Sequence, residues 1–140
     1  VASYEGLTGG IIAHKLKDAS GELFLQGVIG CQPNVFHSLL SASIEGLSFD
    51  ELMCDGAAMA DGMAAAIRSQ TGASLGLAVH SVPDVGKQMK NLNSGRTYIS
   101  VACATGTFRR EYNFAGSGTP DRTRAGMNAL DLLRVTVLGL

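Results

Sequence analysis

One segment constrains the fold more than any other: Ser74–His80 (SLGLAVH) contains no Asp, Glu, Lys or Arg. A strand that lacks alternating polar residues has to be covered on both faces, as a central strand between two helical layers is. An alanine-rich helical stretch precedes it and runs to about Gln70, and Gly72 is a typical helix-ending residue. The segment therefore predicts the central strand of an α/β protein.

Other segments complete this sheet and its helices. Four have the apolar or β-branched composition of strands: Val1–Glu5, Gln26–Cys31, Thr97–Cys103 and Thr107–Phe114. Three more are helical by pattern: Ile11–Lys17, Pro33–Ser41 and about Asp121–Val137. Helices between strands imply parallel crossovers, while a turn at Ala104–Gly106 adds an antiparallel hairpin. We expect one domain, residues 1–140, with a three-layer α/β/α sandwich on a mixed five-stranded sheet.

Local signals predict where two helices begin. Thr8 can cap the helix that follows the first strand. Ser48 and Glu51 have the spacing of a capping box at the start of the long alanine-rich helix. Glycine, with 18 residues in 140, predicts tight turns and places where a helix or a ligand lies close to the backbone.

The composition excludes several classes of protein. Apolar residues make up 46% of the chain and charged residues 16%, which is typical of a globular domain. A net charge of −1 gives no field to attract nucleic acid or anionic lipid. No apolar run reaches the ~18 residues of a membrane span, and no secretion leader is recognisable. Three widely spaced cysteines, Cys31, Cys54 and Cys103, predict buried apolar thiols of a reducing, cytoplasmic compartment and neither a disulfide frame nor a metal site.

The glycine-rich turn after the first strand is the best candidate for ligand binding. A strand that ends in glycines and leads into a helix leaves backbone N–H groups at the positive end of the helix dipole. The turn is therefore a candidate phosphate or carboxylate site at Thr8, Gly9 and Gly10. The alternative is a helix cap with two glycines that let the helix pack closely on the sheet. Arg122 and Arg124 lie at the start of the last helix, where cations are mildly unfavourable. They indicate either an anionic partner nearby or arginines that are simply solvated at the surface.

Other residues with reactive side chains give weaker signals. The histidines, His14, His37 and His80, do not have the spacing of metal ligands. His80 ends the central strand, where active-site residues often lie, and is the histidine worth retaining as a candidate. Arg109 and Arg110 lie on an edge strand, where charge prevents strands of two molecules from pairing. No cofactor is expected.

Several segments together resemble the C-terminal domain of competence/damage-inducible protein CinA, the nicotinamide-nucleotide amidase family. Glu5–Ala13 is similar to the family's Glu-Ser-Cys-Thr-Gly-Gly turn and the helix after it. Phe24–Gly30, Gly95–Ala102 and Phe114–Arg134 are similar to later strands and the closing helix, and Met59–Gly62 matches a shorter helix motif. The resemblance covers nearly the whole chain and implies a three-layer α/β/α fold, homo-oligomers, and hydrolysis of the amide of nicotinamide mononucleotide.

The same resemblance shows where this chain departs from the family. Gly6 stands where the family has a nucleophile-type serine, Cys31 replaces a tyrosine, and Phe36 replaces a lysine. The family's Gly-Asp-Arg becomes Gly116–Gly118, and its Thr-Gly-Ile-Ala-Gly-Pro loop becomes roughly His80–Val85. Glu5, Thr8, Gly9, Gly10 and Arg122 are retained.

These departures predict a protein that has lost the amidohydrolase mechanism. Serine-based amide hydrolysis needs a hydroxyl and a base to activate it, and Gly6 and Phe36 supply neither. We expect a scaffold that binds phosphate or a nucleotide weakly, or that acts in a homo-oligomer or with a partner protein. The alternative is an active amidohydrolase with rearranged groups, for which Cys31, His80 and Ser81 are the catalytic candidates.

Overall fold

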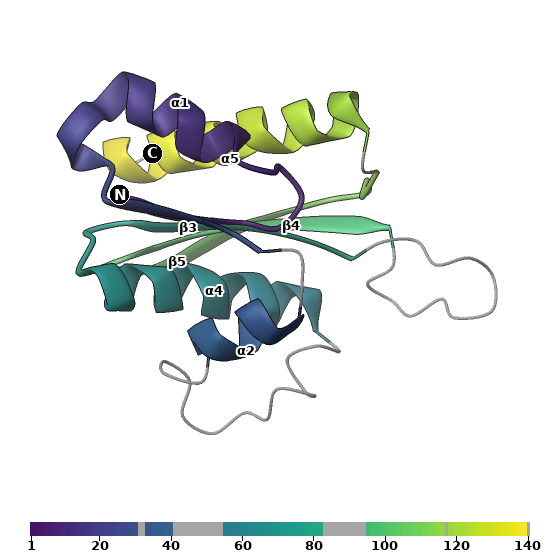
Figure 1. Ribbon diagram of the computed structural model, residues 1–140, viewed down its shortest axis with the longest axis horizontal. Helices are drawn as coiled ribbons and strands as arrows, with labels where there is room; N and C mark the ends of the chain where they lie inside the picture. Colours follow the sequence, from purple (N-terminus) through teal and green to yellow (C-terminus); the bar gives the residue numbers. More distant parts are fainter. Residues whose placement is uncertain (31–32, 41–54, 83–94, 117, 140) are drawn as a thin grey trace.

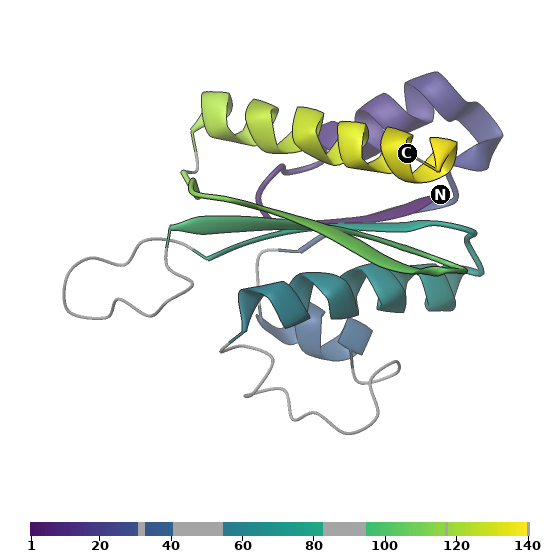
Figure 2. The same ribbon diagram turned by 180° about the vertical axis from the view of Figure 1, so that it is seen from behind.

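The computed structural model describes residues 1–30, 33–40, 55–82, 95–116 and 118–139. The elements in chain order are β1 (Ala2–Glu5), α1 (Ile11–Ser20), the short 3₁₀ helix η1 (Gly21–Leu23), β2 (Gln26–Ile29), α2 (Pro33–Leu40), α4 (Gly56–Thr71), β3 (Gly76–Val82), β4 (Arg96–Cys103), β5 (Gly106–Tyr112) and α5 (Thr119–Leu138). Figure 1 shows α1 and α5 on one face of the sheet and α2 and α4 on the other. Figure 2 shows the same layers from behind.

The sheet has five strands in the order β2-β1-β3-β4-β5. β1 is parallel to β2 and β3, whereas β4 is antiparallel to β3 and β5 is antiparallel to β4. This arrangement confirms the predicted mixed five-stranded sheet between two helical layers.

β3 explains why the apolar run of the sequence is continuous. Leu77 and Val79 pack into the apolar cluster beneath α1 and α5. Ala78 faces the other way, into the cluster around α4. All three side chains are fully buried, so the prediction of a central strand covered on both faces is confirmed.

Small residues allow α4 to lie close to the sheet. A Cβ placed on Gly76 would lie 2.1 Å from the carbonyl oxygen of Ala64, a distance that no real side chain can adopt. Ala60 and Ala64 of α4 are fully buried. The alanine-rich helix and this glycine therefore fit each other, as the high glycine content predicts.

Charged residues on the edge strand β5 hold it to the helices. Arg109 pairs with Asp61 of α4, and the same carboxylate accepts a hydrogen bond of 2.6 Å from the buried Ser100 hydroxyl. Arg110 pairs with Asp131 of α5 at 2.8 Å. Both arginines lie on an edge strand, as predicted, and each also ties that strand to a different helical layer.

Several boundaries differ from the sequence-based expectation. β2 ends at Ile29 and not at Cys31, which lies outside the described residues. β3 is displaced by two residues at each end, β5 is displaced toward the hairpin, and α5 extends the predicted helix at both ends. Boundaries of this kind depend on tertiary hydrogen bonds that the local pattern does not specify.

The predicted start of the alanine-rich helix also needs correction. α4 begins at Gly56, because the Asp55 carboxylate accepts hydrogen bonds from the N–H groups of Ala57 and Ala58. The capping box at Ser48 and Glu51 lies outside the described residues. The predicted end of this helix is confirmed, since Gly72 adopts a left-handed conformation with φ of 67°.

Candidate functional site

A buried carboxylate occupies the N-terminus of α1. Glu5, at the end of β1, is fully buried. Its Oε2 accepts hydrogen bonds from the N–H groups of Gly10 and Ile12, both 3.0 Å away, and its Oε1 accepts one from Ala13 N–H at 2.6 Å. The Thr8 hydroxyl donates a fourth hydrogen bond, also of 2.6 Å. Glu5 thus satisfies helix donors that no residue inside the helix could reach.

This arrangement corrects the predicted role of Thr8. The N-cap residue of α1 is Gly10, and the Thr8 hydroxyl donates to Glu5 instead of accepting a hydrogen bond from the helix backbone. Gly9 and Gly10 have φ values of 62° and 100°, a region that favours glycine. These two glycines turn the chain tightly enough to bring the start of α1 onto the Glu5 carboxylate.

The turn has two further backbone donors, one on a buried residue and one on an exposed residue. Within the described part of the chain, neither Thr8 N–H nor Gly9 N–H has a hydrogen-bond partner. Gly9 is exposed, whereas Gly10 N–H is already bonded to Glu5. The predicted set of three backbone donors is therefore reduced to two that could contact a ligand.

Arg122 lies beside this turn. A Cβ placed on Gly9 would be 3.8 Å from Arg122 Nη1. The Nε of Arg122 is buried and has no hydrogen-bond partner among the described residues. One turn further along α5, Gly126 packs against Ile11, and this close contact between the helices places Arg122 at the start of α1. Arg124 is directed elsewhere, with its guanidinium 5.1 Å from the centre of the Phe114 ring.

Gly6 lies at the carboxyl end of β1, next to Glu5. Its N–H donates to the Val79 carbonyl at 3.0 Å. A Cβ at this position would lie 3.2 Å from that same carbonyl oxygen and 3.7 Å from the Tyr4 ring. The Tyr4 hydroxyl donates a buried hydrogen bond of 2.7 Å to the carbonyl of Gly30. The surroundings of Gly6 are thus backbone carbonyls and an aromatic ring, with little free space.

The structure separates two of the candidate catalytic residues. Val79 packs beneath α1 and α5, so the next residue, His80, faces the opposite layer. Ser81 returns to the side of Val79, where its hydroxyl lies 2.7 Å from the Thr97 hydroxyl. Because His80 and Ser81 point to opposite faces of the sheet, they do not form a base–nucleophile pair. Cys31, the remaining candidate, lies outside the described residues.

His80 is neutral at physiological pH. Burial lowers its pKa from 6.5 to about 4, because a charged imidazolium loses hydration inside the protein. Its partner across the strands is Tyr98, whose ring packs against Gly56 at the start of α4. A neutral imidazole at the carboxyl end of a central strand could accept a proton, but the adjacent Gly6 offers none.

Neither metal ligation nor a membrane span is supported by the residues that the structure describes. No group of three or more His, Cys, Asp or Glu residues there could hold a metal ion. No described helix has both the length and the hydropathy needed to cross a bilayer. Cys103, in the described part of the chain, is an unpaired thiol that is partly exposed, so the expectation of a buried cysteine is wrong at this position.

Sequence reasoning missed the role of Glu5. It treated the glycine turn as a set of free donors, although a glutamate at the end of a buried strand needs hydrogen-bond donors of its own. The need of the Glu5 carboxylate for donors is a signal in the sequence. The nearest donors are at the N-terminus of the helix that follows Glu5, and Thr8 and Gly10 lie between Glu5 and that helix.

Comparisons with known proteins identify the family of this chain. The CinA C-terminal domain family matches residues 1–137. A CinA-like protein of Frankia casuarinae is 34% identical over 145 aligned residues, covering 100% of this chain and 32% of the relative. A CinA-like protein of Desulfotalea psychrophila is 29% identical, with 96% of this chain and 32% of the relative covered. The chain therefore spans about a third of the length of these curated relatives.

Solved structures show the same fold. A CinA superfamily protein from Klebsiella pneumoniae superimposes with a TM-score of 0.80 at 15% identity, covering 99% of this chain and 87% of that one. The competence/damage inducible protein CihA from Agrobacterium tumefaciens gives a TM-score of 0.76 at 19% identity, with 96% and 82% covered. Sequence, topology and these relatives lead to one conclusion: the chain belongs to the CinA C-terminal domain family.

Proposed function

We propose that this CinA-family domain has lost nicotinamide mononucleotide amidohydrolase activity and serves as a scaffold that binds phosphate or a nucleotide weakly and associates with itself or a partner. The observation that carries the proposal is Gly6. It stands where the family resemblance places a nucleophile-type serine, and it has no hydroxyl to activate. The domain is accordingly a cytoplasmic binding or assembly module.

The surroundings of Gly6 support this proposal. The Thr8 hydroxyl is buried with the Glu5 carboxylate to which it donates, so a substrate cannot reach it as a substitute nucleophile. Ser81 is bonded to Thr97 on the other face of the sheet from His80. The alternative, an amidohydrolase with rearranged groups, would have to use the thiol of Cys31 with His80 as base.

An ammonia-release assay with nicotinamide mononucleotide tests the loss of activity. We expect no turnover by the wild-type chain. Turnover above ~1 s⁻¹, the low end of ordinary enzymes, would contradict the proposal. If Cys31→Ser or His80→Ala then abolished that turnover while Ser81→Ala retained it, the alternative mechanism would be correct.

The anion site consists of the N–H groups of Thr8 and Gly9 together with the Arg122 guanidinium. Gly9 is exposed at the positive end of α1, whereas Thr8 is buried. The Glu5 carboxylate already compensates part of the helix dipole and repels a second anion. We therefore expect phosphate to bind with roughly millimolar affinity, about −4 kcal/mol.

Backbone amide NMR tests this site directly. Titration with phosphate and with nicotinamide mononucleotide should shift the amides of Thr8 and Gly9, and Arg122→Ala should weaken the response. Gly10 N–H, bonded to Glu5, should respond less. Arg124→Ala is a matched control, since Arg124 stacks on Phe114 near the start of the same helix. If neither amide has moved at ~20 mM ligand, well above the expected dissociation constant, the turn is purely structural.

A further inference from the structure

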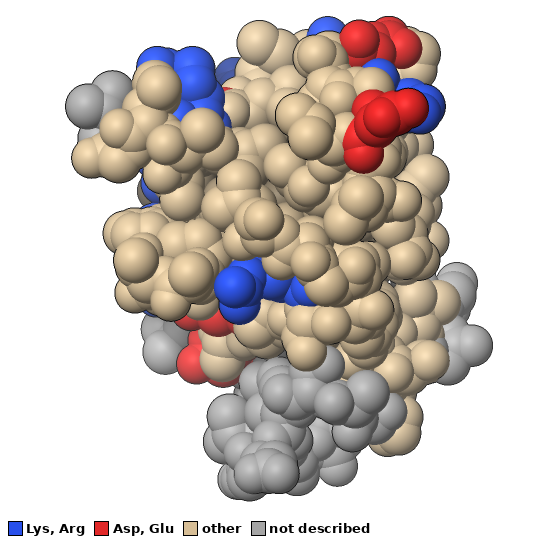
Figure 3. Space-filling model, turned by 90° about the vertical axis from the view of Figure 1, so that its left-hand side faces the viewer, with Lys and Arg blue, Asp and Glu red and all other residues tan. Residues whose placement is uncertain are grey.

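A groove runs along the outer edge of the sheet, between β5 and the last turns of α5. We call it the α5 groove; Phe108 and Arg110 line it from β5, and Leu132, Val135 and Thr136 line it from α5. Its volume is about 430 Å³, which is within the range of small-molecule sites. Uncharged residues form most of the surface on the side of the molecule where α5 ends (Figure 3).

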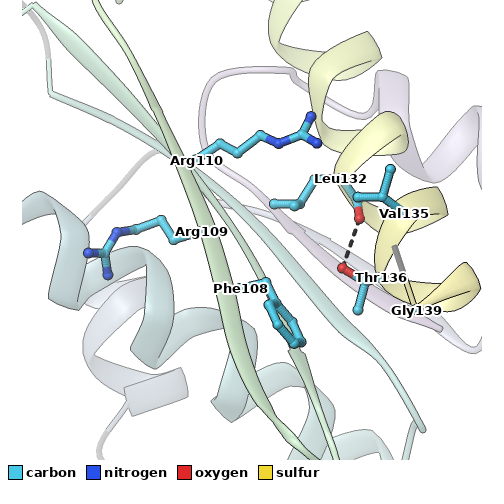
Figure 4. A pocket seen from close by; sticks show the side chains of 7 residues that line it. All are labelled: Phe108, Arg109, Arg110, Leu132, Val135, Thr136 and Gly139. Carbon is cyan, nitrogen blue, oxygen red and sulfur yellow. Dashed lines mark hydrogen bonds between the residues drawn. The ribbon is translucent and has the colours of Figure 1, made fainter.

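The register of β5 determines which side chains enter the α5 groove. Phe108 pairs with Val101 of β4, and Arg110 pairs with Ile99. Val101 and Ile99 both pack in the apolar cluster beneath α5, and directly opposed residues share a face of the sheet. Phe108 and Arg110 therefore face α5, whereas Arg109 between them points to the α4 layer, as Figure 4 shows.

The floor of the α5 groove is apolar and partly open to solvent. Leu132 is only 4% exposed, whereas Phe108 is 47% exposed although it faces a helical layer. Val135 is half-buried beside them. The Thr136 hydroxyl donates to the Leu132 carbonyl of its own helix, 2.8 Å away (Figure 4). An aromatic ring and two aliphatic side chains thus form a surface suited to a hydrocarbon chain.

One end of the α5 groove carries an excess of positive charge. Arg110 Nη1 lies 2.8 Å from one oxygen of Asp131, and Arg134 Nη2 lies 2.9 Å from the other. Two guanidinium groups therefore share one carboxylate, and they retain N–H donors beyond those that Asp131 engages. None of the described residues that line the groove is acidic.

The other end of the α5 groove is unfavourable for an anion. α5 ends at Leu138, and Gly139 follows in a left-handed conformation. The C-terminal end of a helix carries partial negative charge, and the last turn of α5 has no basic residue to offset it. The groove is therefore polarised along its length, from a cationic end at Arg110 to an apolar end beside Gly139.

We propose that the α5 groove binds an amphipathic carboxylate, with its head group at Arg110 and its hydrocarbon tail along Phe108, Leu132 and Val135. Guanidinium groups donate charge-assisted hydrogen bonds to carboxylates, and the apolar floor removes the tail from water. The ligand is a dissolved molecule and not a lipid in a bilayer, because a net charge of −1 gives the chain no attraction to an anionic membrane.

This binding site goes beyond the proposed function and is separate from the anion site at Gly9. Arg122, beside that turn, and Thr136, in the α5 groove, are both on α5. At about 1.5 Å per residue, roughly 20 Å of helix separates them. A ligand in one site therefore leaves the amides of the other site unaffected.

Backbone amide NMR of the full chain tests the α5 groove, with octanoate as the probe. We expect saturable shifts at Phe108, Val135 and Thr136, with a dissociation constant of about 1 mM. Hexanoate, which has two fewer methylene groups, should bind about tenfold more weakly. Octan-1-ol, which has the same tail without the charge, should bind about fivefold more weakly.

Substitutions of charged residues test the position of the head group. Arg110→Gln should weaken octanoate binding about fivefold. Arg124→Gln is the matched control, because Arg124 stacks on Phe114 near the other end of α5, and it should leave the affinity unchanged. Asp131→Asn should tighten binding, since it removes the carboxylate that competes with the ligand for both guanidinium groups.

Three results would overturn the inference. The first is the absence of saturable shifts in the α5 groove at ~10 mM octanoate, well above the expected dissociation constant, even if the chain binds phosphatidylglycerol vesicles. The second is octan-1-ol binding as tightly as octanoate, which needs no variant to fold. The third is an equal loss of affinity in Arg110→Gln and Arg124→Gln. Phosphate-induced shifts at Gly9 test the proposed anion site independently of all three.

Discussion

The helices α1 and α4 begin in two different ways. At α4, the exposed Asp55 is the residue immediately before the helix, and it accepts two hydrogen bonds from the first turn. At α1, the acceptor is Glu5, six residues before the helix, fully buried and holding four donors. The first cap is a local surface feature, whereas the second joins the end of a strand to a helix inside the core.

This difference has an energetic consequence. Asp55 lies in water, and water can replace it as a partner of the helix N–H groups. Water reaches the Glu5 carboxylate poorly, so removing it leaves buried donors without partners, which costs far more than a lost surface hydrogen bond. The two caps should therefore differ strongly in their contribution to the free energy of unfolding.

The largest effect is expected for Glu5→Ala. Three backbone N–H groups and the Thr8 hydroxyl lose their acceptor at once, and each unsatisfied buried group costs ~1–3 kcal/mol. We expect the free energy of unfolding to fall by at least about 3 kcal/mol, measured by urea denaturation. The free energy of unfolding of Glu5→Gln, which keeps one acceptor oxygen, should lie between that of the wild type and that of Glu5→Ala. A loss under ~1 kcal/mol in Glu5→Ala would mean that water replaces the carboxylate.

The dependence of stability on pH tests a second group near the same turn, His80. The pKa of His80 is about 4 in the folded state against 6.5 when unfolded. Its contribution to stability is complete above pH ~6.5 and is lost as the pH falls toward 4, because the unfolded chain binds the proton first. The loss is on the order of 3 kcal/mol.

The measurement is the free energy of unfolding of wild type and His80→Gln between pH 7 and 4. The variant should lose less stability over this range than the wild type. His14→Gln controls for a histidine at the surface, where His14 pairs with Asp18. If the free energy of unfolding fell equally with pH in wild type and His80→Gln, the lowered pKa assigned to His80 would be contradicted.

A smaller effect is expected for Asp55→Ala. Loss of an N-cap side chain typically costs ~1 kcal/mol, and here the exposed N–H groups of Ala57 and Ala58 can bind water instead. Urea denaturation should show a decrease of about this size, well below that of Glu5→Ala. If the two variants were equally destabilised, the distinction between a surface cap and a core cap would fail.

The sequence could predict those features that depend on neighbouring residues. The strand covered on both faces, the hairpin at Ala104–Gly106 and the helix end at Gly72 follow from local chemistry, and the structure contains all three. The cap of α1 could not be predicted in the same way, since it depends on how Gly9 and Gly10 turn the chain back onto Glu5. The proximity of Arg122 to this turn depends on the packing of α5 against α1, which the pattern suggested only through the family resemblance.

The smallest effect is expected for Gly6→Ser, which restores the missing hydroxyl beside the Glu5 cap. A Cβ at Gly6 would lie 3.2 Å from the Val79 carbonyl, so the backbone has to move by only a few tenths of an ångström. Gly6 also lies outside the left-handed region that favours glycine. We expect a loss of no more than ~1 kcal/mol in urea denaturation, typical of a tolerated substitution.

Gly76→Ala is the matched contrast, because its Cβ would lie 2.1 Å from the Ala64 carbonyl and force α4 away from the sheet. That variant should be destabilised much more than Gly6→Ser. A Gly6→Ser chain that folds normally but releases no ammonia from nicotinamide mononucleotide would show that a hydroxyl alone does not rebuild the mechanism. This is the expected outcome, since Phe36 stands where the family resemblance places a lysine. Severe unfolding of Gly6→Ser would instead mean that the space beside Glu5 has closed around glycine.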